Sequence, residues 1–252
     1  MTENSPQRPA IREALESVTD PELDRSIVDL EYVDEITVDG DRVTVEFTLP
    51  TAWCSPAFAW MMAIDAREAV EELAGVSECT VVLREHLHEE EINRGVNEGL
   101  SFEETFPDAE DGIDPLREKL DEKARLARQY TALETLRGVG LESAAIVDLR
   151  PEDLAPVDED VLAVHPPGRA VALVVPAAPL ERYLEKARET GVVTEPDDVL
   201  FRTPAGEPID HERFELVYRR CRAARVNMSG QGGICRGLHE SRKKRLEEAA
   251  DD

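Results

Sequence analysis

Residues 35–62, EITVDGDRVTVEFTLPTAWCSPAFAWMM, decide the fold of the first part of this 252-residue chain. Residues 35–39 and 43–49 alternate between apolar and polar side chains as β-strands do, and Gly40-Asp41 is typical of the turn between two strands. Pro56 suits the first position of a helix. We therefore predict a β-hairpin with one buried face, followed directly by a helix.

The segments on either side of the hairpin complete a small domain. A short helix is expected over residues 11–18, ending at Asp20-Pro21 because the residue before a proline is pushed out of the helical region. Beyond the hairpin we expect a helix to about Leu73, a break at Gly75 and a third strand over residues 79–83. The order α-β-β-α-β predicts an α+β sandwich of one sheet against two helices.

A second domain is expected after the loop FPDAEDGIDP, which contains the proline, glycine and acidic residues typical of a boundary. The predicted domains are residues 1–113 and 114–252. The second should begin with a charged, amphipathic linker helix over residues 116–137 and continue as a mixed α/β domain whose role the sequence leaves open. Within it, the stretch NMSGQGGIC, residues 227–235, is expected to form a flexible loop.

Acidic residues dominate the composition. Asp and Glu number 55 against 29 Lys and Arg, which gives a formal net charge of -26, and only 5 of the 29 cations are lysine. Such charge repels itself in dilute buffer and is screened by salt, so we expect a halophilic protein of a high-salt cytoplasm. The charge also argues against nucleic acid as a partner. The alternative is an acidic protein with no adaptation to salt.

The sequence predicts a cytoplasmic protein with no membrane partner. Its first residues, MTENSPQRPAIREALESV, have no apolar segment of the kind found in secretion signals. No stretch approaches the roughly 20 apolar residues of a membrane span. In a reducing compartment, cysteines are expected to be core residues, ligands or nucleophiles rather than disulfides.

Cys54 is the cysteine most suited to chemistry. It lies just before the helix expected at Pro56, for which Ser55 is a good N-cap. Backbone N–H groups at a helix start favour the thiolate, which is the form that binds soft metals. The alternative is an inert cysteine packed beside Trp53. Cys79 alternates with apolar residues on its predicted strand and is expected in the core.

Residues 18–58, VTDPELDRSIVDLEYVDEITVDGDRVTVEFTLPTAWCSPAF, resemble the PaaD/SufT-like family of iron–sulfur cluster assembly proteins. The resemblance covers residues 10–84 and rests on the hairpin and on the motif residues Asp20, Pro21, Glu22, Ile27, Val28, Asp29, Leu30, Thr51, Cys54 and Pro56. Two positions depart from the pattern. Glu31 stands where the family usually has glycine, and Ser55 separates Cys54 from Pro56.

The resemblance implies a role in the maturation of iron–sulfur proteins, with Cys54 as a transient cluster ligand and Thr51, Ser55 and the other motif residues around it. Clusters normally take four thiolates. One cysteine therefore suits handover, with the remaining ligands coming from a second protomer in a homodimer, a carrier or scaffold protein, or the client apo-metalloprotein.

We accordingly expect an adaptor or transfer factor, serving client metalloproteins such as a multicomponent oxygenase. An enzyme is not expected, because the sequence shows no Ser/His/Asp order, P-loop or GxGxxG motif. The alternative is a metal-independent docking or regulatory module.

Two further sets of residues have the chemistry of metal ligands. His86 and His88 would share one face if the third strand continued, and the carboxylates of residues 89–91 follow; histidine with carboxylate binds iron or zinc. The alternative is a solvated helix start with surface histidines. Residues 92–99, INRGVNEG, are expected to form a client-docking loop. The second set has the spacing C-x13-C-x3-H and consists of Cys221, Cys235 and His239.

Overall fold

The computed structural model describes residues 6–109 and 112–250, and it confirms the predicted α+β class. The chain divides into two compact units. The first comprises Met1–Arg117 together with Gly230–Asp252, and the second comprises Glu118–Ser229. The segment from Gly230 onward thus groups with the first unit, whereas we had placed it in the second domain; the boundary at residue 113 stays a prediction.

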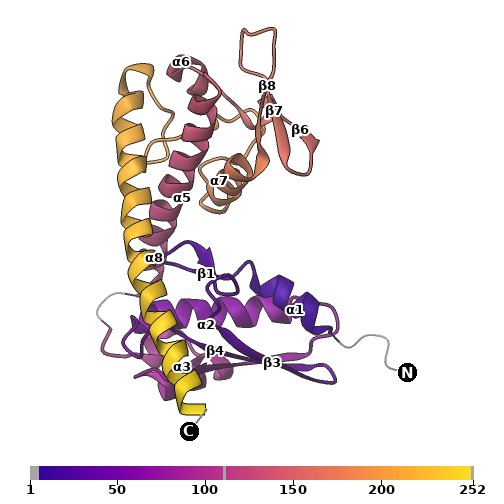
Figure 1. Ribbon diagram of the computed structural model, residues 1–252, viewed down its shortest axis with the longest axis vertical. Coiled ribbons are helices and arrows are strands. Elements are labelled where there is room, and N and C mark those ends of the chain that lie inside the picture. The colour runs from indigo at the N-terminus through magenta and orange to yellow at the C-terminus, as the bar shows by residue number, and fades with distance from the viewer. Residues whose placement is uncertain (1–5, 110–111, 251–252) are drawn as a thin grey trace. The chain divides into compact units, whose positions relative to one another are not determined.

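The first unit contains the predicted hairpin, crossover helix and third strand (Figure 1). Its sheet has the order β3-β4-β5, with β3 and β4 antiparallel and β4 and β5 parallel. The first helix ends at Leu15 instead of near Asp20, because residues 19 and 20 pair with residues 25 and 26 in a small extra hairpin. The elements are α1 (Arg8–Leu15), β1 (Thr19–Asp20), β2 (Arg25–Ser26), β3 (Val33–Asp39), β4 (Arg42–Thr48), α2 (Pro56–Glu71), β5 (Glu78–Arg84), α3 (Glu89–Glu98) and α4 (Phe102–Thr105).

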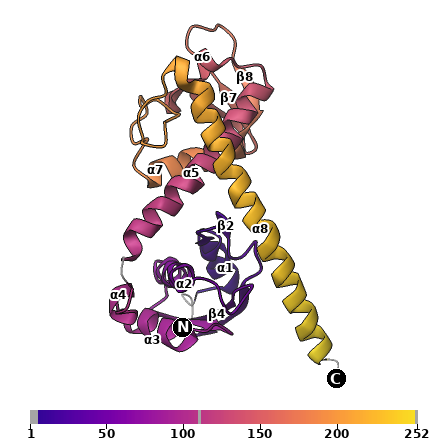
Figure 2. The ribbon, with the colours of Figure 1, turned by 90° about the vertical axis from the view of Figure 1, so that its left-hand side faces the viewer.

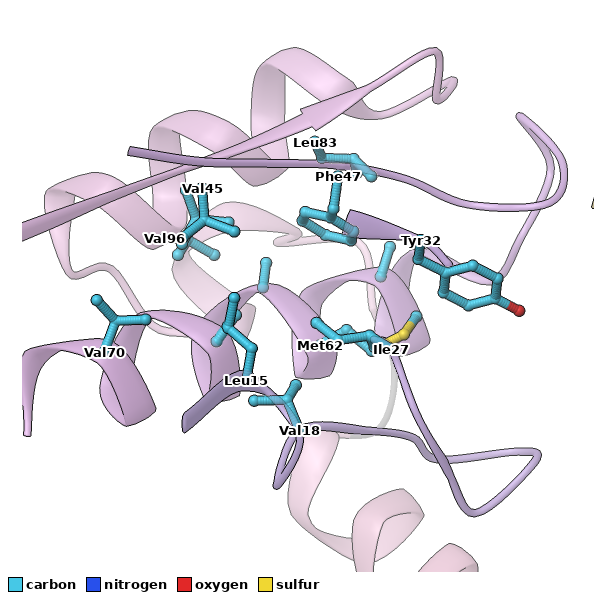
Figure 3. Packing of buried hydrophobic residues seen from close by; sticks show 14 of the residues in the cluster. Leu15, Val18, Ile27, Tyr32, Val45, Phe47, Met62, Val70, Leu83 and Val96 are labelled. Atoms are coloured by element: carbon cyan, nitrogen blue, oxygen red, sulfur yellow. The ribbon is translucent and has the colours of Figure 1, made fainter. Parts of the chain in front are cut away.

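The core of this unit lies between the sheet and helices α1 and α2. Alternate residues of β4 are buried, as the sequence pattern predicts for a strand with one face on the core. Figure 3 shows Val45, Phe47 and Leu83 of the sheet pointing toward Leu15 of α1 and Met62 of α2. Burying each such side chain contributes about 1.5–3 kcal/mol, so this cluster accounts for much of the stability of the unit.

Helix α3 covers the free edge of β5. Asn93 Oδ1 accepts a hydrogen bond from Leu83 N (2.8 Å) while Asn93 Nδ2 donates to Leu83 O (3.0 Å). Asn97 makes the same pair of bonds with Val81, at 2.9 and 2.8 Å. The two amides thus replace the strand that would otherwise pair with this edge. The predicted docking loop over residues 92–99 is therefore wrong, since residues 92–98 are helical.

The turn before β3 retains the geometry expected of a glycine. Glu31 has a φ of 57°, in the left-handed region that glycine adopts at least cost. Hydrogen bonds from Leu30 N to Ser26 O (2.9 Å) and from Tyr32 N to Ile27 O (2.9 Å) close the turn. The departure from the family pattern at residue 31 therefore leaves the turn in place.

The second unit has its own sheet and core (Figure 2). The sheet is antiparallel with the order β6-β7-β8. Arg125 is almost fully buried, and its Nη2 donates to the carbonyls of Thr203 (3.2 Å) and Pro204 (3.0 Å), which holds the turn at residues 204–206. The elements are α5 (Ile113–Gly138), α6 (Ser143–Ile146), β6 (Leu154–Asp158), β7 (Val161–Val164), β8 (Leu173–Pro176), α7 (Ala177–Glu189) and α8 (Phe214–Ala250), with short 3-10 turns at Pro151–Asp153 and His211–Arg213.

Helix α8 continues through the stretch predicted to be a flexible loop, so that prediction is wrong. Each glycine in a helix interior costs about 1 kcal/mol relative to alanine, and residues 227–235 include three. A β-carbon at Gly232 would lie 3.7 Å from Leu23 Cδ2, an ordinary van der Waals distance, so this part of the helix lies beside Leu23 within the first unit. None of the helices in the described ranges is long and apolar enough to cross a membrane.

Candidate functional site

The loop between β4 and α2 carries the thiol that the sequence singles out. Helix α2 begins at Pro56 with Ser55 at the N-cap position, although the Ser55 side chain makes no capping hydrogen bond. Cys54 is half-buried, and its Sγ lies 3.4 Å from Thr51 Oγ1. The Cys54 side chain thus packs against the edge of the core of the first unit, and the Thr51 hydroxyl contacts its sulfur.

His86 fixes the backbone of this loop. Its Nδ1 accepts a hydrogen bond from His88 N (3.1 Å), and since a backbone N–H can only donate, the ring proton belongs on Nε2, which then donates to Cys54 O (2.9 Å). Burial lowers the pKa of His86 and so favours this neutral ring. A bond from Leu87 N to Ala52 O (3.0 Å) adds a second attachment.

The third strand does not continue through His86 and His88, which was the condition for the two side chains to share a strand face. Strand β5 ends at Arg84, and Glu85 takes a left-handed φ of 53°, which turns the chain. His88 then occupies the N-cap position of α3, and its ring packs edge-on against Phe106 with centroids 5.6 Å apart. The two histidine rings are 6.1 Å apart between centroids. As a metal pair they stay a prediction.

Asp20 organises the Asp-Pro-Glu motif. Its Oδ1 accepts hydrogen bonds from Glu22 N (2.9 Å) and Leu23 N (3.1 Å), and the Tyr32 hydroxyl donates to its Oδ2 (3.4 Å). The side chain is buried, and burial raises its pKa to about 6 despite these donors. Pro21 and Glu22 are half-buried in the turn that follows, whereas Asp29 of the same predicted motif is exposed.

The raised pKa of Asp20 gives the protein a characteristic pH dependence. Between about pH 4 and 6 the folded state holds a proton that the unfolded state has released, so stability is fully present below the unfolded pKa of 3.8 and falls as the pH rises to about 6. We expect Asp20→Asn, which resembles the protonated acid, to be about 2 kcal/mol more stable than the wild type at pH 7 and equal to it near pH 4. Urea unfolding at both pH values measures this difference. A constant offset between the two proteins at every pH would contradict it.

The structure separates the four cysteines into two kinds. Cys79 packs in the core of the first unit and Cys221 in the core of the second, and burial raises the pKa of each thiol to about 12. The prediction that Cys79 is a core residue is confirmed. Cys54 and Cys235 are half-buried.

The predicted C-x13-C-x3-H set is not brought together. Cys221 and Cys235 are fourteen positions apart on one continuous helix, a separation of about 21 Å along its axis. Within residues 6–109 and 112–250, no group of three or more His, Cys, Asp or Glu side chains is arranged to hold a metal ion.

Cys235 and His239 instead belong to the first unit, where they lie near the Cys54 loop. The His239 ring packs on Tyr32 with centroids 5.7 Å apart. Burial first, and then the carboxylate of Asp20, raise the pKa of Cys235 to about 11. Sequence reasoning grouped Cys235 with Cys221 and missed Tyr32. The available signal was the spacing of residues 235, 238, 239 and 242, which places them on one helix face.

A pocket of about 660 Å³ adjoins the site. Trp53, 75% exposed, and Leu87, 62% exposed, are apolar side chains that line it. Arg242 also lines it, with Nε 3.0 Å from Glu85 Oε2 and Nη1 3.3 Å from Leu49 O. The other lining residues are Pro50, Thr51, Ala52, His86, Leu238 and Ser241.

The first unit is thus a small α+β domain with a half-buried thiol in the loop before helix α2. The family model described as iron-sulfur cluster assembly protein matches residues 8–82, from α1 into β5. An uncharacterized protein of Methanocaldococcus jannaschii is 39% identical over 87 residues, which cover 34% of this chain and 88% of that protein. The chain belongs to the iron–sulfur cluster assembly protein family. The predicted resemblance is confirmed for the N-terminal region, and the C-terminal half has no assignment.

Proposed function

We propose that this protein is an adaptor or transfer factor that passes iron–sulfur clusters to client apo-metalloproteins, with Cys54 as a transient cluster ligand. The observation that supports this most is the state of Cys54: it is half-buried in a loop whose backbone is fixed by His86 and Leu87. Thiolates are the usual ligands of iron–sulfur clusters. A single thiolate in a fixed loop would hold a cluster for transfer, without the four ligands that would retain it.

The proposed partner proteins are those that would supply the cluster ligands that this chain lacks. A cluster bound through Cys54 needs further thiolates, which a carrier or scaffold protein, the client or a second copy of this chain would supply. The clients include iron–sulfur or diiron oxygenases of several components. In this proposal the cluster is cargo, the protein has no turnover chemistry of its own, and it acts in the cytoplasm.

A metal-independent docking module is the second candidate. The exposure of Trp53 and Leu87 beside the pocket favours it, because large apolar side chains at a hollow often mark protein contacts. Anaerobic reconstitution with iron and sulfide separates the two candidates. The adaptor should show cluster absorption that Cys54→Ala removes, whereas a docking module should show none in either protein.

Exchanging Cys54 and Cys79 for alanine tests the assignment in living cells. We expect Cys54→Ala to leave stability nearly unchanged, because a half-buried loop thiol buries little area, but to lower the activity of client iron–sulfur enzymes about tenfold when it replaces the native gene. Cys79→Ala should do the reverse, costing about 1 kcal/mol or more of core packing while maturation persists. Enzyme assays in cell extracts and urea unfolding measure the two effects. The assignment fails if Cys54→Ala destabilises the fold and the clients stay active.

The net charge of -26 leads to a prediction for salt. We expect the melting temperature to rise from dilute to molar KCl, because counterions screen the repulsion among surface carboxylates. Differential scanning calorimetry measures the shift, and a sucrose series at matched osmolality serves as the uncharged control. A flat or falling curve in KCl would leave the protein acidic without being halophilic.

A further inference from the structure

The described end of α8 and the Cys54 loop meet at one place in the first unit. Leu238, Ser241 and Arg242 line the pocket together with residues 51–53. Arg242 attaches the helix at two points, to the carboxylate of Glu85 and to the backbone at the end of β4. This segment, which lies outside the region matched by the family model, therefore forms part of the surroundings of Cys54.

Cys235 lies on the face of α8 that makes these contacts. It is three positions after Gly232 and four before His239, spacings that place all three residues on one side of a helix. Gly232 approaches Leu23, and His239 packs on Tyr32. Cys235 thus lies between two positions of α8 that adjoin the segment that also carries Asp20.

The lining of the pocket agrees with this placement. Leu238 and Arg242, three and seven positions after Cys235 and on the same helix face, line the pocket with residues 51–53, which directly precede Cys54. Cys221, on the same helix, is buried in the other unit among apolar side chains. Of the two cysteines in α8, only Cys235 is positioned toward the Cys54 site.

We propose that Cys235 is a second thiol ligand of the Cys54 site, so that one chain offers two thiolates to a thiophilic metal, namely the iron of a cluster in transit. The inference rests on the proposed function and adds a ligand to it. Binding exchanges the two S–H bonds for two metal–sulfur bonds and releases two protons, with no change in oxidation state. Two ligands leave the remaining coordination positions open for a partner, as handover requires.

Anaerobic titration of the full chain with Cd²⁺ tests the pair, because each bound thiolate adds to the ultraviolet thiolate-to-metal band. The wild type should show the intensity of two thiolates per ion. Cys235→Ala and Cys54→Ala should each show about half that intensity and at least tenfold weaker binding. Cys221→Ala, on the same helix, is the matched control and should titrate as the wild type does.

Two checks keep the test decisive. Melting curves followed by tryptophan fluorescence show whether each variant folds, since both tryptophans, Trp53 and Trp60, lie in the first unit. Cys235→Ser is measured beside Cys235→Ala because serine keeps a side chain of similar size. In the unmodified protein, dibromobimane becomes fluorescent only when it links two neighbouring thiols, so peptide mapping should recover a Cys54–Cys235 link. Single labelling of each thiol without a link would overturn the proposal.

The outcomes for the pair and for the proposed function are distinct. If Cys235→Ala binds Cd²⁺ as the wild type does, the second ligand is wrong, and the transfer function stands as long as Cys54→Ala impairs client maturation. The other outcome is that the wild type shows the two-thiolate band but cells carrying the Cys54→Ala variant have fully active client enzymes. The thiol pair is then supported and the transfer function is wrong.

Discussion

Replacing Gly95 by alanine is expected to lower the free energy of unfolding of the first unit by about 3 kcal/mol. In most helix interiors this change stabilises by about 1 kcal/mol, because glycine loses more backbone entropy on folding. Here a β-carbon would lie 2.7 Å from a ring carbon of Trp60 and closer still to Thr105 Oγ1. Trp60 cannot move easily, because it is buried and packs edge-on against Phe102 and Phe106.

Urea unfolding followed by tryptophan fluorescence measures this loss, since both tryptophans report on the first unit. Gly237→Ala is the matched control: its β-carbon would have no heavy atom within 4 Å, so stability should stay level or rise by up to about 1 kcal/mol. Thr105→Ala should recover part of the loss in the double variant, because it removes the closest atom. A Gly95→Ala protein as stable as the wild type would show that α3 packs less tightly than described.

Removing the two amides that cover the edge of β5 should cost still more. Asn93→Ala leaves Leu83 N and O without their partners in a buried strand, and Asn97→Ala does the same to Val81. Leaving a buried backbone group unpaired costs about 1–3 kcal/mol, so we expect about 2–3 kcal/mol for each variant and about 5 kcal/mol for both. The exposed edge should also pair with other chains and promote aggregation.

The same fluorescence assay gives the stability, and light scattering during the melt gives the aggregation. Arg94→Ala, on the exposed side of the same helix, is the control and should change stability by no more than about 0.5 kcal/mol. Asn93→Asp is a finer test: it keeps the acceptor for Leu83 N but sets a carboxylate against Leu83 O, so it should be destabilising at pH 7 and partly recover in acid. Equal stability of the Asp and Asn proteins at pH 7 would contradict the paired geometry.

The sequence by itself determined the elements whose signals are local. Alternation in residues 43–49 predicted a strand with one buried face, and Pro56 predicted the start of α2. These predictions hold because side-chain periodicity and the fixed φ of proline act within a few residues, whatever the rest of the chain does. The motif around Cys54 indicated the family for the same reason, since its residues are close in sequence.

Only the tertiary structure decided the features that depend on distant partners. The glycines of residues 227–235 favour a loop locally, but the segment is helical, and beyond it Arg242 bonds to the distant Leu49 carbonyl. Burial of Asp20 raises its pKa, and no neighbour in sequence foretells that burial. Cys235 reaches the surroundings of Cys54 across 181 positions, because helix packing, and not sequence spacing, sets which side chains meet.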